Sequence, residues 1–144
     1  MDIKLPIINA KQIEQLIPQR APIVMVDCLL SFGVSDIEAG LTVMKNQILV
    51  QEGYLQEAGV IEHMAQTVAL HTGYDFFCKG VAAPVGYIGS IKEIVISRLP
   101  QVSEQMISKA HILQEFMGVT LVEVETFIAG VSIAKGQMKT VIAQ

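Results

Sequence analysis

The feature that most constrains the fold is one long helical pattern that precedes a second half made of strand-like segments. Apolar residues recur at helical spacing between Val60 and Thr72. We expect a helix over residues 58–72, ended by Gly73. Its apolar stripe is wide, and a helix of this kind is usually covered on several sides by the rest of the fold.

The remainder of the chain predicts mainly strands. Beyond the helix lie four long β candidates, residues 86–99, 102–113, 118–128 and 130–143. Their short connectors, Pro100-Gln101 among them, favour antiparallel hairpins. Before the helix, residues 22–30 and 39–45 are further strand candidates, and Asn9 can cap a short helix that stops at Pro18. The expected fold class is α+β, with one long central helix wrapped by a curved antiparallel sheet.

The length of 144 residues predicts one domain that spans residues 1–144. Apolar residues make up 51% of the chain and charged residues only 17%, so part of the surface should be covered. No run reaches the roughly 18 uncharged apolar residues of a membrane span, and the N-terminus lacks the pattern of a signal peptide. We therefore expect a cytoplasmic protein that forms a homodimer or higher oligomer.

The charge of the chain and the spacing of its histidines and cysteines disfavour several classes of function. The net charge of −4, without a cluster of lysine and arginine, argues against nucleic-acid binding. No nucleotide-cofactor motif occurs, and no histidines and cysteines have metal-site spacing, so we expect no cofactor and no metal. Cys28 and Cys78 are isolated in the sequence, and both are interpreted as reduced, buried thiols.

Glu62 is the most unusual residue of the helical pattern, because it lies among apolar neighbours in the expected first turn. A favourable interaction with the helix dipole would explain it without any function. Gln66 follows one turn later, so its amide can reach the Glu62 carboxylate. An acid, an orienting amide and the backbone N–H groups of a helix N-terminus together suit proton transfer beside a carbonyl group.

These residues are part of a resemblance that covers residues 10–142. The motif LPHRxPxLxVD of hotdog-fold (3R)-3-hydroxyacyl-acyl-carrier-protein dehydratases resembles LIPQRAPIVMVD at residues 16–27, and their helix motif EAMAQ is similar to EHMAQ at residues 62–66. The end of the family pattern is similar to the stretches Ile91-Lys92, Leu99-Pro100 and Val131-Ser132-Ile133-Ala134. The branch that the chain most resembles is that of predicted dehydratases of the aryl-polyene type.

The resemblance implies a hotdog fold in which two protomers join their sheets edge to edge, with acyl tunnels at the interface. It implies that Glu62 is catalytic and that Gln66 binds the substrate. Gly59 and Val60, at the start of the expected helix, are further substrate-binding candidates, although Gly59 is not aligned with the helix-starting glycine of the family. That substrate would be a 3-hydroxyacyl thioester on the phosphopantetheine of an acyl carrier protein. Loss of water would give the trans-2-enoyl thioester, a lyase reaction of fatty-acid-like or polyene biosynthesis.

One residue of the family pattern is missing. The family carries a catalytic histidine in GHFPGxPxxPG, but the corresponding residues 46–57 contain neither histidine nor Pro-Gly. His63 follows Glu62 directly and is the candidate for a second catalytic residue, although adjacent helix residues point about 100° apart. Packing or hydrogen bonding is the alternative role. His71 is interpreted as structural and His111 as a surface or interface residue.

Three functions remain open at this stage. The preferred one is dehydration of the 3-hydroxyacyl thioester. The second is a non-catalytic acyl-binding subunit that completes a heterodimeric dehydratase with a paralogue, which the missing histidine favours. The third is an acyl thioesterase, in which the carboxylate activates water.

Overall fold

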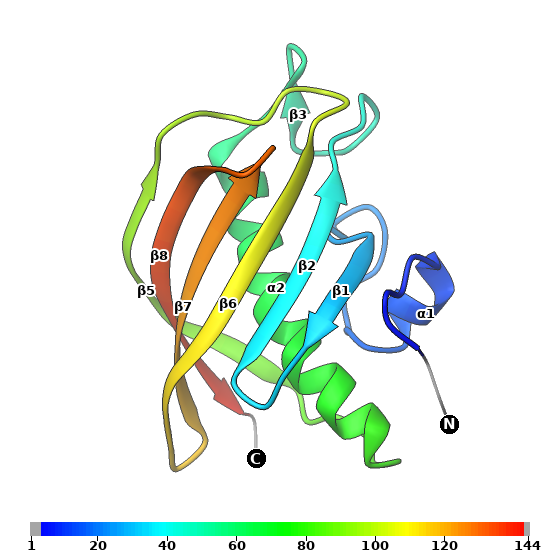
Figure 1. Ribbon diagram of the computed structural model, residues 1–144, viewed down its shortest axis with the longest axis vertical. Helices are drawn as coiled ribbons and strands as arrows, with labels where there is room; N and C mark the ends of the chain where they lie inside the picture. The colour runs from blue at the N-terminus through cyan, green and yellow to red at the C-terminus, as the bar shows by residue number, and fades with distance from the viewer. Residues whose placement is uncertain (1–3, 143–144) are drawn as a thin grey trace.

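The computed structural model describes residues 4–142, in which one long helix packs against a six-stranded sheet (Figure 1). The strand order is β1-β2-β6-β7-β8-β5, and every neighbouring pair is antiparallel. The strands are β1 (Cys28–Phe32), β2 (Asp36–Thr42), β5 (Gly86–Ile96), β6 (Gln105–Phe116), β7 (Val119–Ile128) and β8 (Val131–Ile142). This arrangement confirms the expected α+β hotdog fold.

The long helix α2 (Glu57–Cys78) lies behind the sheet in Figure 1, and the curved strands wrap around it. Burial of apolar side chains between these two layers is the main driving force for such a fold. The core between them includes fully or almost fully buried side chains from the helix and from four strands, namely Val60, Met64, Leu70, Ile37, Leu41, Met106, Val124, Ile133 and Met138.

The helix is longer than predicted, because Gly73 does not end it. Gly73 is buried, and a Cβ atom at this position would overlap the backbone carbonyl of Leu16. The missing side chain therefore lets the N-terminal part of the chain lie directly on α2. The helix ends at Cys78, and the chain turns away at Gly80, whose φ is +69°.

The N-terminal region contains the predicted short helix, α1 (Ala10–Glu14). The Asn9 side chain caps it by accepting hydrogen bonds from the N–H groups of Lys11 and Gln12. Residues 16–27, called here the N-terminal segment, then run along α2 without entering the sheet. The strand expected over residues 22–30 begins only at Cys28, because the backbone groups of Met25 bond to α2 side chains instead.

Tight turns join the later strands as predicted at two places. Met117-Gly118 and Ala129-Gly130 connect β6 to β7 and β7 to β8, and all four residues have positive φ, as two-residue hairpin turns of type I′ require. A similar turn, Glu52-Gly53, joins β3 (Val50–Gln51) to β4 (Tyr54–Leu55). The sequence patterns did not predict this small hairpin.

The prediction of a hairpin at Pro100-Gln101 is wrong, because β5 and β6 do not pair with each other: β5 pairs with β8, and β6 pairs with β2 and β7. Residues 97–104 instead cross from one edge of the sheet to its middle. As a result β5 forms an edge of the sheet (Figure 1). It carries four exposed large apolar side chains, Tyr87 (62%), Ile88 (40%), Ile91 (45%) and Val95 (67%).

A row of charged side chains crosses the face of the sheet opposite α2. Glu38, Lys109, Glu125 and Lys135 are successive cross-strand partners on β2, β6, β7 and β8, so the sign of the charge alternates across the sheet. The Lys109 ammonium lies 3.4 Å from the Glu38 carboxylate. Within residues 4–142, no helix combines the length and apolar character needed to cross a bilayer.

Candidate functional site

A cavity of about 740 Å³ lies between α2, residues of β5 to β8 and the start of the N-terminal segment. Its helical wall runs along α2 from Glu62 to Phe76 and includes Ala65, Ala69 and Thr72 on the same helix face as Glu62. Fourteen residues separate the ends of this wall, so it is about 21 Å long. Small side chains in its middle leave space beside the helix, and a carboxylate lies near one end. This shape suits an extended apolar chain with a polar head.

Glu62 is half-buried and lies in the second turn of α2, not the first, because the helix begins at Glu57. The Nε2 group of Gln66 donates a hydrogen bond of 2.9 Å to the Glu62 Oε2 atom, which is the contact that their spacing predicted. Among residues 4–142 this is the only hydrogen bond of the Glu62 side chain. Its Oε1 atom therefore remains available for a ligand in the cavity.

Gln66 is fully buried and joins the site to the N-terminal segment. Its Oε1 atom accepts a hydrogen bond from the Met25 N–H at 2.7 Å, and its Nε2 group donates to the Ile23 carbonyl at 2.9 Å. Because a backbone N–H only donates and a carbonyl only accepts, these contacts fix the orientation of the amide. Gln66 thus positions Glu62, and it does not line the cavity.

His63 is fully buried and also lies outside the cavity wall. Its Nδ1 atom is 2.7 Å from the Met25 carbonyl, so Nδ1 carries the hydrogen and Nε2 has no partner among the described residues. Burial lowers the pKa of His63 to about 4, against the opposing effect of the Met25 hydrogen bond, so the ring is neutral at pH 7. The geometry matches the packing and hydrogen-bonding role rather than that of a second catalytic group beside Glu62.

The other two histidines have partners of their own. His71 lines the cavity, but its Nε2 atom is 2.9 Å from the Gly33 carbonyl and its ring stacks on Phe32 at 4.7 Å between centroids. His111 lies on the outer face, where its Nδ1 atom contacts the Asp36 carboxylate at 2.6 Å. These contacts agree with the structural and surface roles that the sequence indicated.

Gly59 and Val60 are not brought to the cavity. Both are buried, and both donate their backbone N–H groups to the Gln56 carbonyl, at 2.9 and 3.1 Å. The Gly59 Cα instead faces the Leu55 side chain. These two N–H groups are therefore committed within the start of the helix.

The cavity-lining residues on the same helix face as Glu62 were not predicted, although their spacing in the sequence indicates them. Ala65, Ala69, Thr72 and Phe76 follow Glu62 at intervals of 3, 7, 10 and 14 residues, which is one face of an α-helix. Tracing that face from the candidate acid would have identified them.

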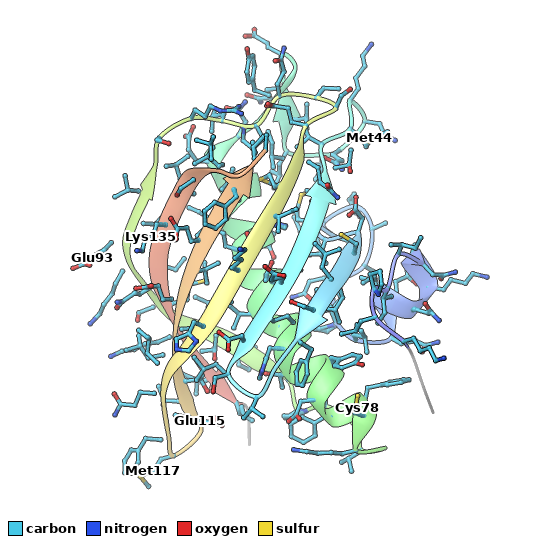
Figure 2. The ribbon with its side chains drawn as sticks, in the orientation of Figure 1. Met44, Cys78, Glu93, Glu115, Met117 and Lys135 are labelled. Atoms are coloured by element: carbon cyan, nitrogen blue, oxygen red, sulfur yellow. The ribbon has the colours of Figure 1, made fainter. Side chains whose placement is uncertain are left out.

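The two cysteines differ in burial. Cys28 is buried as predicted, and burial, assisted by the neighbouring Asp27 carboxylate, raises the pKa of its thiol to about 11. Cys78 is exposed, so that part of the prediction is wrong; it is the last residue of α2, which extends beyond the expected end (Figure 2). In the described part of the chain no cluster of three or more His, Cys, Asp or Glu side chains could hold a metal ion.

Comparison with known families gives one match that spans nearly all of the sequence. The model of the ApeP-like family, described as ApeP dehydratase, matches residues 11–143. No curated protein sequence matches the chain.

Solved structures with the same fold are numerous. One is the dehydratase heterocomplex ApeI:P from Xenorhabdus doucetiae, with a TM-score of 0.86 at 18% identity over 99% of this chain and 93% of that chain. The uncharacterized protein PH1136 from Pyrococcus horikoshii has a TM-score of 0.70 at 14% identity, covering 98% and 96% of the two chains. A hypothetical thioesterase with coenzyme A from Streptococcus pneumoniae TIGR4 has a TM-score of 0.64 at 11% identity, covering 80% and 84%.

Proposed function

Because the chain belongs to the ApeP-like dehydratase family, we propose that it removes water from a 3-hydroxyacyl thioester carried on an acyl carrier protein. The observation that carries this proposal is the Glu62 carboxylate, held by Gln66 near one end of the 21 Å cavity wall. The reacting carbons would lie beside Glu62, and the acyl chain would extend along Ala65 and Ala69 toward Phe76.

The reaction needs a base for the α-proton and an acid for the departing hydroxyl. If Glu62 acts alone, its carboxylate takes the α-proton, and the C–H electron pair forms the double bond as the C3–O bond breaks. The same carboxyl group then returns its proton to the hydroxide, which leaves as water. Glu62 ends the reaction as the carboxylate it began as, because it takes one proton from the substrate and gives one to the leaving hydroxide.

A second subunit can divide these two tasks. The described residues place no histidine beside Glu62, since His63 is bonded to Met25 and His71 to Gly33. A hotdog paralogue that carries the family histidine would supply the missing base or acid across the interface, while this chain supplies Glu62. The likeness to one chain of the ApeI:P dehydratase heterocomplex supports this version of the proposal.

The edge strand β5 is the surface that such a subunit would use. It carries Tyr87, Ile88, Ile91 and Val95 in exposed positions, and Tyr87 and Ile88 also line the cavity. A strand added to this edge would bury apolar side chains and satisfy the unpaired backbone groups of the edge. It would also bring the side chains of the partner close to the cavity.

The enzyme proposal is tested by assaying 3-hydroxyacyl, enoyl and saturated acyl thioesters of acyl carrier protein in single-turnover reactions. Dehydration gives the enoyl product, thioester hydrolysis releases the thiol, and simple binding gives neither. Glu62→Gln should lower dehydration by at least about 10²-fold, the scale expected for a general acid or base. Full activity of this variant would contradict the role of Glu62.

The partner proposal is tested by comparing the chain alone with the chain mixed with a histidine-bearing hotdog paralogue. The variant Ile91→Glu/Val95→Glu should abolish association and any activity that depends on it. Met44→Glu is the matched control, because Met44 is 52% exposed and lies on the side of the sheet away from β5 (Figure 2). Association that survives the edge variant would rule out β5 as the docking surface.

A further inference from the structure

His63 is a buried polar side chain that the proposed mechanism does not use. It is fully buried in the helix of the candidate site, next in sequence to Glu62, yet it lies outside the cavity. Its one hydrogen bond among the described residues goes to the Met25 carbonyl at 2.7 Å. Burying a histidine costs desolvation free energy, and here the imidazole makes only one hydrogen bond in return among the described residues. This suggests that the bond to Met25 has a role.

The contact is one half of a clamp around Met25. The Met25 carbonyl accepts from His63, and the Met25 N–H donates to Gln66 at 2.7 Å. These two side chains are three residues apart and lie on one face of α2. Met25 is fully buried, so both of its backbone groups depend on this helix face for hydrogen bonds.

The clamp is joined directly to the candidate catalytic carboxylate. Gln66 uses one N–H on the Ile23 carbonyl and the other on Glu62, both at 2.9 Å. The amide can hold Glu62 in this orientation only while Met25 and Ile23 hold the amide. Any shift of the N-terminal segment therefore changes the position of the Glu62 carboxylate.

From this arrangement we propose that His63 is a positioning residue for the dehydratase site. Its imidazole fixes the Met25 carbonyl, the fixed segment orients Gln66, and Gln66 orients Glu62 for proton transfer. This inference rests on the proposed role of Glu62. Without the Nδ1–H donor, a buried carbonyl would lose its partner, and the segment would move to find another. Small displacements of a catalytic group reduce the rate while leaving substrate binding largely intact.

The test compares His63→Leu, which fills the space but donates no hydrogen bond, with His63→Asn, whose amide N–H can replace the Nδ1–H. Activity is measured in the assembly that dehydrates the acyl carrier thioester. His63→Leu should lower kcat about tenfold with little change in KM, and His63→Asn should restore kcat to within about threefold of the wild type. His111→Asn, on the exposed outer face, is the matched control.

A double-mutant cycle separates positioning from general destabilisation. If His63 acts through Glu62, then His63→Leu should not reduce kcat further in a Glu62→Gln background. Multiplying losses would overturn the proposal, because they would show that the two residues act independently. If His63→Leu does not fold, His63→Asn decides the question: a folded variant with kcat as low as that of Glu62→Gln also overturns it.

Hydrogen–deuterium exchange distinguishes failure of this inference from failure of the proposed function. In His63→Leu, exchange of peptides from residues 16–27 should rise at least about tenfold, while peptides of β7 and β8 keep wild-type rates. If the wild type shows no dehydratase activity with or without a partner, the proposed function fails whatever the exchange shows. Unchanged exchange at residues 16–27 would refute the clamp even in a fully active enzyme.

Discussion

Mild acid should destabilise this protein through His63, and the size of the effect follows from its burial. Burial lowers the pKa of His63 from 6.5 to about 4, with the Met25 hydrogen bond acting in the opposite direction. Between pH 6.5 and 4 the unfolded chain therefore binds a proton that the folded chain excludes. Stability is fully present above pH 6.5 and is lost progressively as the pH falls toward 4.

The linkage relation converts this pKa difference into a measurable loss. Lowering the pH from 7 to 5 should cost about 2 kcal/mol of unfolding free energy through this one side chain. For a chain of this length that corresponds to a decrease in Tm of about 6 °C. Other groups titrate over the same range, so the quantity to compare is the difference between the wild type and His63→Asn, which removes the titrating ring.

The assay is urea unfolding of both proteins at pH 7, 6 and 5 and at one fixed protein concentration, since association contributes to apparent stability. The wild type should lose about 2 kcal/mol more than His63→Asn between pH 7 and pH 5. Equal losses in the two proteins would refute the reasoning. They would mean that the imidazole is hydrated or already charged in the folded state.

Two further predictions concern stability away from the imidazole. Gly73→Ala should lower the unfolding free energy by at least about 2 kcal/mol despite the higher helix propensity of alanine, because the new methyl group meets the rigid backbone of Leu16. Gly59→Ala, whose methyl group meets side-chain atoms of Leu55 and Leu49 but no backbone, should cost less when the thermal melts of both variants are compared. The paired Arg98 guanidinium lowers the pKa of the Glu104 carboxyl to about 2, so its stabilisation is present above pH 4.5 and lost as the pH falls toward 2. Glu104→Gln should therefore cost under about 1 kcal/mol at pH 7, and unfolding curves of the two proteins should converge near pH 2.

The parts of the fold that depend on local sequence were predictable. Helical periodicity located α2, and alternation with two-residue turns located β6, β7 and β8. The prediction failed where a distant segment decides the conformation. Gly73 continues the helix because Leu16 needs the space, and residues 22–27 stay outside the sheet because α2 side chains bond to Met25.

The candidate site was predictable to a similar extent. The Glu62–Gln66 contact depends only on helix geometry, so its spacing was sufficient evidence. The separation of His63 from the cavity depends on which backbone group the ring meets, 38 residues away in the sequence. No pattern within one helix contains that information. Gly59 and Val60 are a different case, because their N–H groups bond to the Gln56 carbonyl only three and four residues earlier, as soon as the helix start at Glu57 is known.

The distribution of open and closed surfaces around the sheet also limits how many subunits can assemble. One face is covered by α2, the other carries the alternating charges that begin with Glu38 and Lys109, and the β1 edge is bridged at Leu29 by Ile7. The β5 edge is thus the natural direction of growth. If subunits pair through β5 as proposed, two such edges that meet around a two-fold or pseudo-two-fold axis cover each other, so association would stop at a closed pair and would not continue into a filament.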